Sequence, residues 1–113
     1  MLNNIGGIYM DKKDLPKALA YYNKSLVIHE ENNDKKGVST SLNNIAGIYR
    51  GLSLEQGDLS TALLYFFKSL KLSEELNDRQ GIASTLNNIG RIYYDKNNIV
   101  KALEYGNKGL LLV

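Results

Sequence analysis

The chain has 113 residues, of which 43% are hydrophobic and 23% are charged, and this is enough apolar material for one folded core but not for two. The 14 Lys and Arg residues nearly balance the 12 Asp and Glu residues, so the charge gives no support for a nucleic-acid-binding or membrane-surface protein. Cysteine is absent, which excludes disulfides and thiolate chemistry, and no apolar run is long enough to span a membrane. We expect one soluble domain without a signal sequence, in the cytoplasm rather than the periplasm, although composition leaves the compartment open.

The chain opens with the segment LNNIGGIY at residues 2–9, which returns as LNNIAGIY at residues 42–49 and as LNNIGRIY at residues 86–93. A second segment follows each of these, at residues 14–26, 58–70 and 98–110, and the three second segments also resemble one another. The sequence is therefore three copies of a two-part unit, with units at residues 1–33, 34–77 and 78–113.

Both parts of the unit have helical periodicity. Apolar residues recur at i, i+3 and i+7 in residues 42–49, and at i, i+4, i+7 and i+11 in residues 58–70, whereas a half-buried strand would alternate. The connections are short, so consecutive helices should pack antiparallel. Side chains that can cap a helix N-terminus precede the expected helices at Asp14, Asp34, Asp58, Asp78 and Asn98, and Pro16 suits a first turn.

Small and large residues recur at fixed places in the units. The small ones allow two helix backbones to approach closely, and the aromatic ones are expected to fill the core rather than to form a ligand cage. The small set comprises Gly6, Ala46 and Gly90 with Ala18, Ala62 and Ala102, and the aromatic set comprises Tyr9, Tyr49 and Tyr93 with Tyr22 and Phe66.

Unit two is longer than the others, because 13 positions separate Tyr49 from Ala62 where 9 separate Tyr93 from Ala102. Four extra residues make about one helical turn. We expect either one more turn of helix or a bulky loop near residues 50–57. A tolerated insertion and a dedicated contact point both remain open as its meaning.

The combination of Leu42, Ile45, Ala46 and Tyr49 with Ala62 and Phe66 resembles the tetratricopeptide repeat (TPR) pattern, and the match extends over the whole chain. The spacing is similar to the longer TPR units of bacterial signalling proteins and kinesin light chains. The resemblance implies an all-α solenoid of three antiparallel helix pairs wound as a right-handed superhelix. Unit three departs from the pattern at Gly106 and Gly109, where an aromatic and a small Ala or Ser are usual, and each glycine weakens that helix by roughly 1 kcal/mol relative to Ala.

In the family, the first helices of the pairs form a concave groove that binds a protein or an extended peptide, so the resemblance implies such a partner. Repeated asparagines can pair with both the C=O and the N–H of a peptide backbone, although hydrogen bonding between neighbouring repeats is an open alternative for them. The expected peptide-binding residues are Asn3, Asn43 and Asn87, the neighbouring Asn44 and Asn88, and Gly47, Arg50, Arg91 and Tyr94.

Catalysis finds no support in the sequence. His29 is the sole histidine, near the end of a second helix, and no metal-ligand cluster, phosphate-binding loop or Ser/His/Asp set can be assembled, so we expect no enzyme activity, cofactor or metal. A second hypothesis makes the array a sensory or regulatory segment of a larger bacterial signalling protein, such as a histidine kinase or transcriptional regulator. The chain starts inside a first helix, so we expect a piece of a longer protein; end-to-end self-association through residues 110–113 is the alternative.

Overall fold

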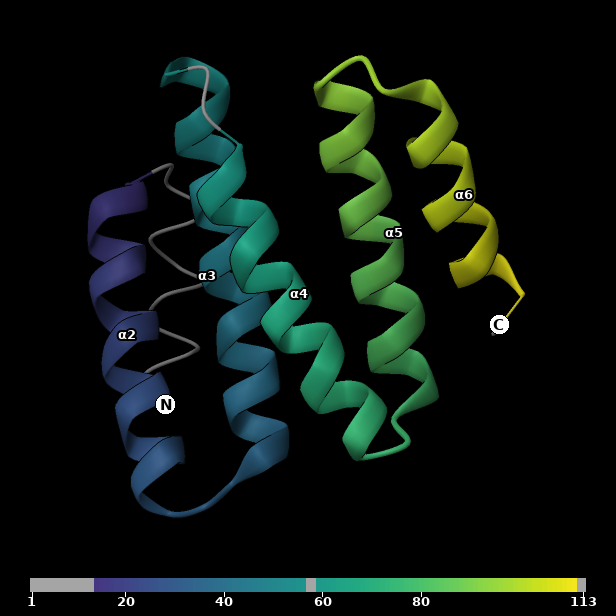
Figure 1. Cartoon of the computed structure of the whole chain (residues 1–113). Helices are drawn as coiled ribbons and strands as arrows, with labels where there is room; N and C mark the ends of the chain where they lie inside the picture. Colours follow the sequence, from purple (N-terminus) through teal and green to yellow (C-terminus); the bar gives the residue numbers. More distant parts are fainter. Residues whose placement is uncertain (1–13, 57–58, 112–113) are drawn as a thin grey trace.

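A computed structural model describes residues 14–56 and 59–111, and every regular element within these ranges is an α-helix. The helices are α2 (Leu15–Glu31), α3 (Lys35–Gln56), α4 (Ser60–Glu75), α5 (Arg79–Asp95) and α6 (Ile99–Leu110). They lie next to one another in chain order, from α2 at one end of the array to α6 at the other (Figure 1). The predicted all-α solenoid is therefore confirmed, while the helix expected over residues 2–9 lies outside the described residues.

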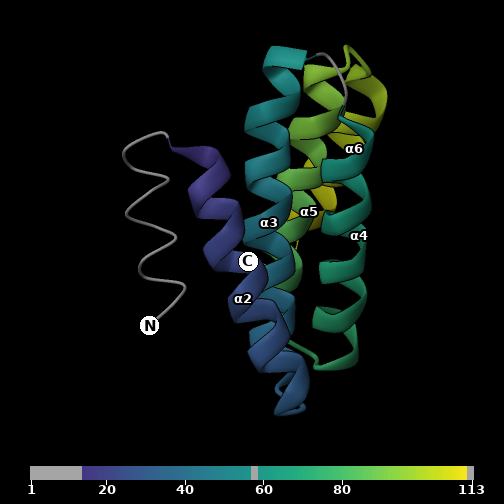
Figure 2. The same cartoon turned by 90° about the vertical axis from the view of Figure 1, so that its left-hand side faces the viewer.

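The array is two helices thick. It measures 37 × 34 × 20 Å, and its smallest dimension matches two helix diameters of about 10 Å each. Figure 2 shows it from the α2 end, where α2 is inclined relative to α3 and α4. In such an array each helix pair is covered by the next pair along the chain, so the core forms between consecutive units.

Most of the predicted N-caps are confirmed. In four cases the side-chain oxygen of the capping residue accepts a hydrogen bond from the backbone N–H three residues later, at 3.0–3.4 Å. Helix α4 differs, because it begins at Ser60 and its N-cap is Leu59, which makes no side-chain capping bond; Asp58 lies outside the described residues. The four capping residues are Asp14, Asp34, Asp78 and Asn98.

The turns after α2, α4 and α5 share one backbone conformation. Asn33, Asn77 and Asn97 have φ angles of 53°, 53° and 61°, in the left-handed region that asparagine tolerates better than most residues. In the turn after α4, the N–H of Asn77 donates to the carbonyl of Glu74, and the N–H of Asp78 donates to the carbonyl of Ser73. Each asparagine thus ends one helix and is followed directly by the N-cap of the next.

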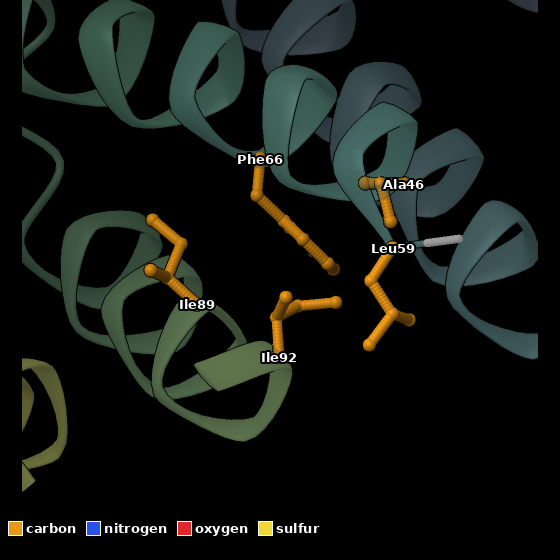
Figure 3. Packing of buried hydrophobic residues seen from close by; sticks show 6 residues of the cluster. Ala46, Leu59, Phe66, Ile89 and Ile92 are labelled. Carbon is orange, nitrogen blue, oxygen red and sulfur yellow. The ribbon is translucent and has the colours of Figure 1, made fainter. Parts of the chain in front are cut away.

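The core uses one packing arrangement twice. In the first cluster Tyr22 of α2 lies with Ile45 and Ile48 of α3, and in the second Phe66 of α4 lies with Ile89 and Ile92 of α5 (Figure 3). In both clusters an aromatic ring from a second helix is covered by two isoleucines, three residues apart, from the first helix of the next unit. Burial of these side chains, at about 25 cal/mol per Å² of apolar surface, holds consecutive units together.

The extra residues of unit two lengthen a helix. Helix α3 has 22 residues and runs to Gln56, whereas the equivalent α5 has 17 residues and ends at Asp95. Of the two forms expected for the insertion, an additional helical turn is the one that the structure shows.

Candidate functional site

The predicted peptide-binding residues fall on the first helices of units two and three. Asn43, Gly47 and Arg50 follow one another at i, i+4 and i+7 on α3, and their repeat equivalents on α5 are Asn87, Arg91 and Tyr94. This spacing places each trio on one side of its helix. We call these six residues the first-helix face. Asn3, the equivalent residue in unit one, lies outside the described residues.

The α5 part of the first-helix face is open and hollowed. Asn87, Arg91 and Tyr94 are all exposed, and the Tyr94 side chain reaches 66% exposure. The three side chains line one cleft of about 290 Å³ between α5 and α6, whose other walls include Ile99 and Leu103. The structure therefore brings these three predicted residues together beside an apolar wall.

The asparagines of neighbouring units contact each other. Asn88 Nδ2 donates to Asn43 Oδ1 at 3.5 Å, a long hydrogen bond between α5 and α3, and both side chains are half-buried. This contact supports the inter-repeat alternative for Asn43 and Asn88. The contact uses the side-chain oxygen of Asn43. The side-chain amide of Asn43 also has two N–H groups, which can donate to a ligand. Asn44 is half-buried on α3, whereas Asn87 is exposed on α5.

Arg50 has a partner inside the chain. Its Nε atom lies 2.8 Å from Asp95 Oδ2, and the two side chains are 31% and 14% exposed. The ion pair joins α3 to the last residue of α5, so a ligand carboxylate at Arg50 would have to compete with Asp95. Arg91, which is exposed on α5, is the better placed of the two predicted cations.

Gly47 leaves space on α3. A Cβ atom added there would meet no heavy atom within 4 Å, so the backbone of α3 is accessible between Asn43 and Arg50. A peptide chain could approach the helix at this point without displacing a side chain.

Comparison with known protein families assigns the chain to one of them. Residues 1–66 match the family model described as tetratricopeptide repeat. The chain belongs to the tetratricopeptide repeat family. TPR arrays are generally protein-interaction modules and non-catalytic scaffolds, which agrees with the coarse functional prediction from the sequence.

A solved structure supports the same assignment. The chain is similar to the crystal structure of BtubC (BKLC) from P. vanneervenii, with a TM-score of 0.82 and 26% sequence identity. The match covers 98% of this chain and 44% of that chain, so the TPR array described here spans less than half the length of BtubC. No curated protein sequence matches the chain.

Two features of this TPR array were missed by the sequence interpretation. Ser39 of α3 and Ser69 of α4 exchange hydrogen bonds between hydroxyl and carbonyl at 3.1 and 2.8 Å, and Ser73 joins them. Tyr49 stacks on Tyr65 with 5.5 Å between the ring centroids. The equivalent pair in unit three, Tyr93 and Tyr105, stacks in the same way at 5.4 Å. The sequence could have singled out these tyrosines. Tyr21, Tyr65 and Tyr105 occupy the same position in each unit, and each has a lysine three residues later.

Asp34, which caps α3, contacts both a backbone N–H group and the only histidine of the sequence. The pKa of Asp34 lies below its ordinary value, mainly because the backbone N–H of Gly37 donates to the carboxylate; His29, whose Nδ1 lies 3.0 Å from Asp34 Oδ2, lowers it further. Within residues 14–56 and 59–111, no group of three His, Asp or Glu side chains could hold a metal ion. None of the helices described is long and apolar enough to cross a membrane.

Proposed function

We propose that this TPR array binds an extended segment of a partner protein along its first-helix face. The observation that carries the proposal is the cleft beside α5, where Asn87, Arg91 and Tyr94 are exposed together. A carboxamide, a guanidinium and a phenol supply directional polar contacts, and the wall of the cleft supplies apolar surface. Binding sites combine these two kinds of surface in this way.

The residues favour a particular kind of peptide. Asn87 can pair with both the N–H and the C=O of an extended backbone, and the open helix surface at Gly47 would receive the neighbouring part of the ligand. Arg91 favours an acidic side chain or carboxylate, because it can form two parallel charge-assisted hydrogen bonds. Tyr94 offers a broad surface at low entropic cost. We therefore expect an acidic segment with at least one apolar side chain.

A peptide-display selection on the intact chain tests the proposal. Selected peptides should be enriched in Asp and Glu, and the Arg91→Glu variant should lose about tenfold or more in affinity for them. Asn87→Ala should weaken binding without changing the melting temperature, because the side chain is exposed. Lys24→Glu reverses an exposed charge on α2, which does not line the cleft, and is the matched control.

Two results would contradict the proposal. One is a set of selected peptides whose affinity is the same for wild type and for Arg91→Glu. The other is a loss of affinity as large in Lys24→Glu as in Arg91→Glu, which would show that overall charge, rather than the first-helix face, controls binding.

A further inference from the structure

The turn from α4 to α5 repeats the turn from α2 to α3, with one exchange of side chain. Both turns contain an asparagine at positive φ, then an aspartate N-cap, and then a glycine whose N–H donates to that aspartate. The last turn of α2 carries His29, whereas the equivalent residue of α4 is Ser73. The contacts of His29 therefore indicate which chemical group suits the surroundings of Ser73.

His29 completes the contacts of an aspartate. Asp34 Oδ1 accepts the backbone N–H of Gly37 at 3.0 Å, and Asp34 Oδ2 lies 3.0 Å from His29 Nδ1. The imidazole ring lies directly against Gly37, because a Cβ atom added to that glycine would collide with it. An imidazole ring thus fills the space between the end of α2 and the start of α3.

Beside Ser73 the corresponding place is a notch. It measures about 80 Å³ and lies between α3, α4 and α5, with Asp78 and Gly81 among its lining residues. Asp78 Oδ1 accepts the N–H of Gly81 at 3.1 Å, as in the other turn. No Lys, Arg or His lines the notch, and within residues 14–56 and 59–111 none of them forms an ion pair with Asp78. Asp78 Oδ2 can therefore accept a hydrogen bond from a ligand. We call this place the Asp78 notch.

The walls of the Asp78 notch are polar. They contain six hydroxyl groups, one side-chain amide and one carboxylate. Thr40 and Ser84 are exposed and the other four hydroxyl-bearing residues are buried, so the notch runs from the surface into the contact between three helices. A hydroxyl can donate or accept a hydrogen bond, and a hydrogen bond to a carboxylate is stronger where water is partly excluded. The four buried residues are Ser39, Ser69, Ser73 and Thr85.

The size of the Asp78 notch limits what can occupy it. A water molecule takes about 30 Å³ in the liquid, so the notch has room for about two or three waters or for one small ring. A primary ammonium group would pair with Asp78 but would leave most of this volume unfilled. A five-membered ring that carries N–H groups fills the volume and also donates to the carboxylate, as His29 does at Asp34.

We propose that the Asp78 notch binds an imidazole ring, which donates an N–H to Asp78 Oδ2 and is surrounded by the hydroxyl groups of the walls. The ring comes from a histidine side chain of a partner protein or from a free imidazole compound. The proposal goes beyond the proposed function and does not depend on it, because the Asp78 notch shares no residue with the cleft between α5 and α6.

Titrations of the intact, ¹⁵N-labelled chain with two probes test the proposal by NMR. The probes are imidazole and the blocked tripeptide Gly-His-Gly. Imidazole should shift the Gly81 amide in a saturable way with a roughly millimolar dissociation constant, as expected for a ligand of so few atoms. The Gly37 amide should not shift, because His29 already lies there. Comparable affinity for the tripeptide would assign the ring to a protein histidine, and binding of imidazole alone would assign it to a small molecule.

Variants at the two turns provide the controls. Asp78→Asn keeps a side chain that can cap α5 but removes the carboxylate, and should weaken imidazole binding about fivefold or more. Asp34→Asn makes the same change where His29 is already present, and should leave the affinity unchanged. Ser73→His supplies a ring from the chain itself and should abolish binding. If circular dichroism shows that Ser73→His does not fold, Asp78→Asn still decides.

Four outcomes would overturn the proposal. The first is a Gly81 amide that does not shift or shifts without saturation, which would leave water as the occupant of the notch. The second is unchanged affinity in folded Asp78→Asn or in folded Ser73→His. The third is a loss in Asp34→Asn as large as that in Asp78→Asn. The fourth is equal affinity for guanidinium or methylammonium, which would show a general cation site.

Discussion

The same substitution, Gly→Ala, should have different effects at two glycines that lie close together on α5 and α6. Gly90 is in the middle of α5, and Gly106 is in the middle of α6. Alanine is favoured over glycine inside a helix by about 0.5–1 kcal/mol, and this gain is common to both sites. The two positions differ in what the added methyl group would meet.

The geometry sets the size of the difference. At Gly106 the added Cβ meets nothing within 4 Å, so Gly106→Ala should raise the free energy of unfolding by the full gain of about 0.5–1 kcal/mol. At Gly90 the Cβ would lie 3.2 and 3.3 Å from two backbone atoms of α6, which cannot rotate away as a side chain can. Overpacking of this kind costs about 1–3 kcal/mol. Gly90→Ala should therefore be less stable than Gly106→Ala by about 1–3 kcal/mol.

Urea unfolding followed by circular dichroism measures both values. The melting temperatures of the two variants should differ by roughly 4–12 °C, because a difference of 1 kcal/mol shifts the melting temperature of a domain of this size by about 4 °C. Hydrogen exchange at the amides of α5 and α6 should show the same order, which matters because repeat arrays can open locally. Equal stability of the two variants would refute the conclusion that α5 and α6 touch at Gly90 and are open at Gly106.

Three further predictions concern turns, pH and charge pairs. Asn77→Val should lose about 1–2 kcal/mol in urea unfolding, because a β-branched residue is strained at a φ of 53°, and Asn77→Gly should lose little. Because the pKa of Asp34 is lowered in the folded state, the ionised carboxylate stabilises the fold at pH values above the ordinary carboxyl pKa. This contribution is lost as the pH falls through the lowered pKa. Melting curves of wild type and Asp34→Ala should therefore differ most near neutral pH and converge below about pH 4. Arg50→Ala should cost about 1–3 kcal/mol in denaturant unfolding, since it leaves the mostly buried Asp95 carboxylate unpaired, whereas Lys108→Ala should cost less than about 0.5 kcal/mol because that lysine belongs to an exposed pair.

The helices could be predicted from the sequence because their determinants are local. Apolar periodicity, the capping residues and Pro16 in a first turn act within a few positions of the chain, and the repeat shows the periodicity and the capping residues more than once. The left-handed asparagines could have been found in the same way. Asn33 and Asn77 stand at equivalent places directly before an N-cap, and asparagine is, after glycine, the residue that favours this conformation.

The partner of Arg50 could not be predicted in this way. Asp95 is 45 positions away, and the repeat gives no warning, since the equivalent of Arg50 in unit three is Tyr94. An ion pair between units depends on how two helices stack, which periodicity does not specify. The remaining signal was that Arg50 and Asp95, two residues of opposite charge, occupy the same end of neighbouring first helices.

Differences between the units carry more functional information than their similarities. Positions that are alike in every unit, such as the small residues at Ala46 and Gly90, are explained by the packing that each unit needs. Arg91 stands where unit two has Gly47, and Gly106 stands where unit two has Phe66. Neither change improves the packing of α5 on α6, because the Arg91 side chain is exposed and a Cβ atom added at Gly106 would meet no heavy atom within 4 Å. A change that stability does not require is better explained by function, and Arg91 lies with Asn87 and Tyr94 in the cleft that we propose as the peptide-binding site.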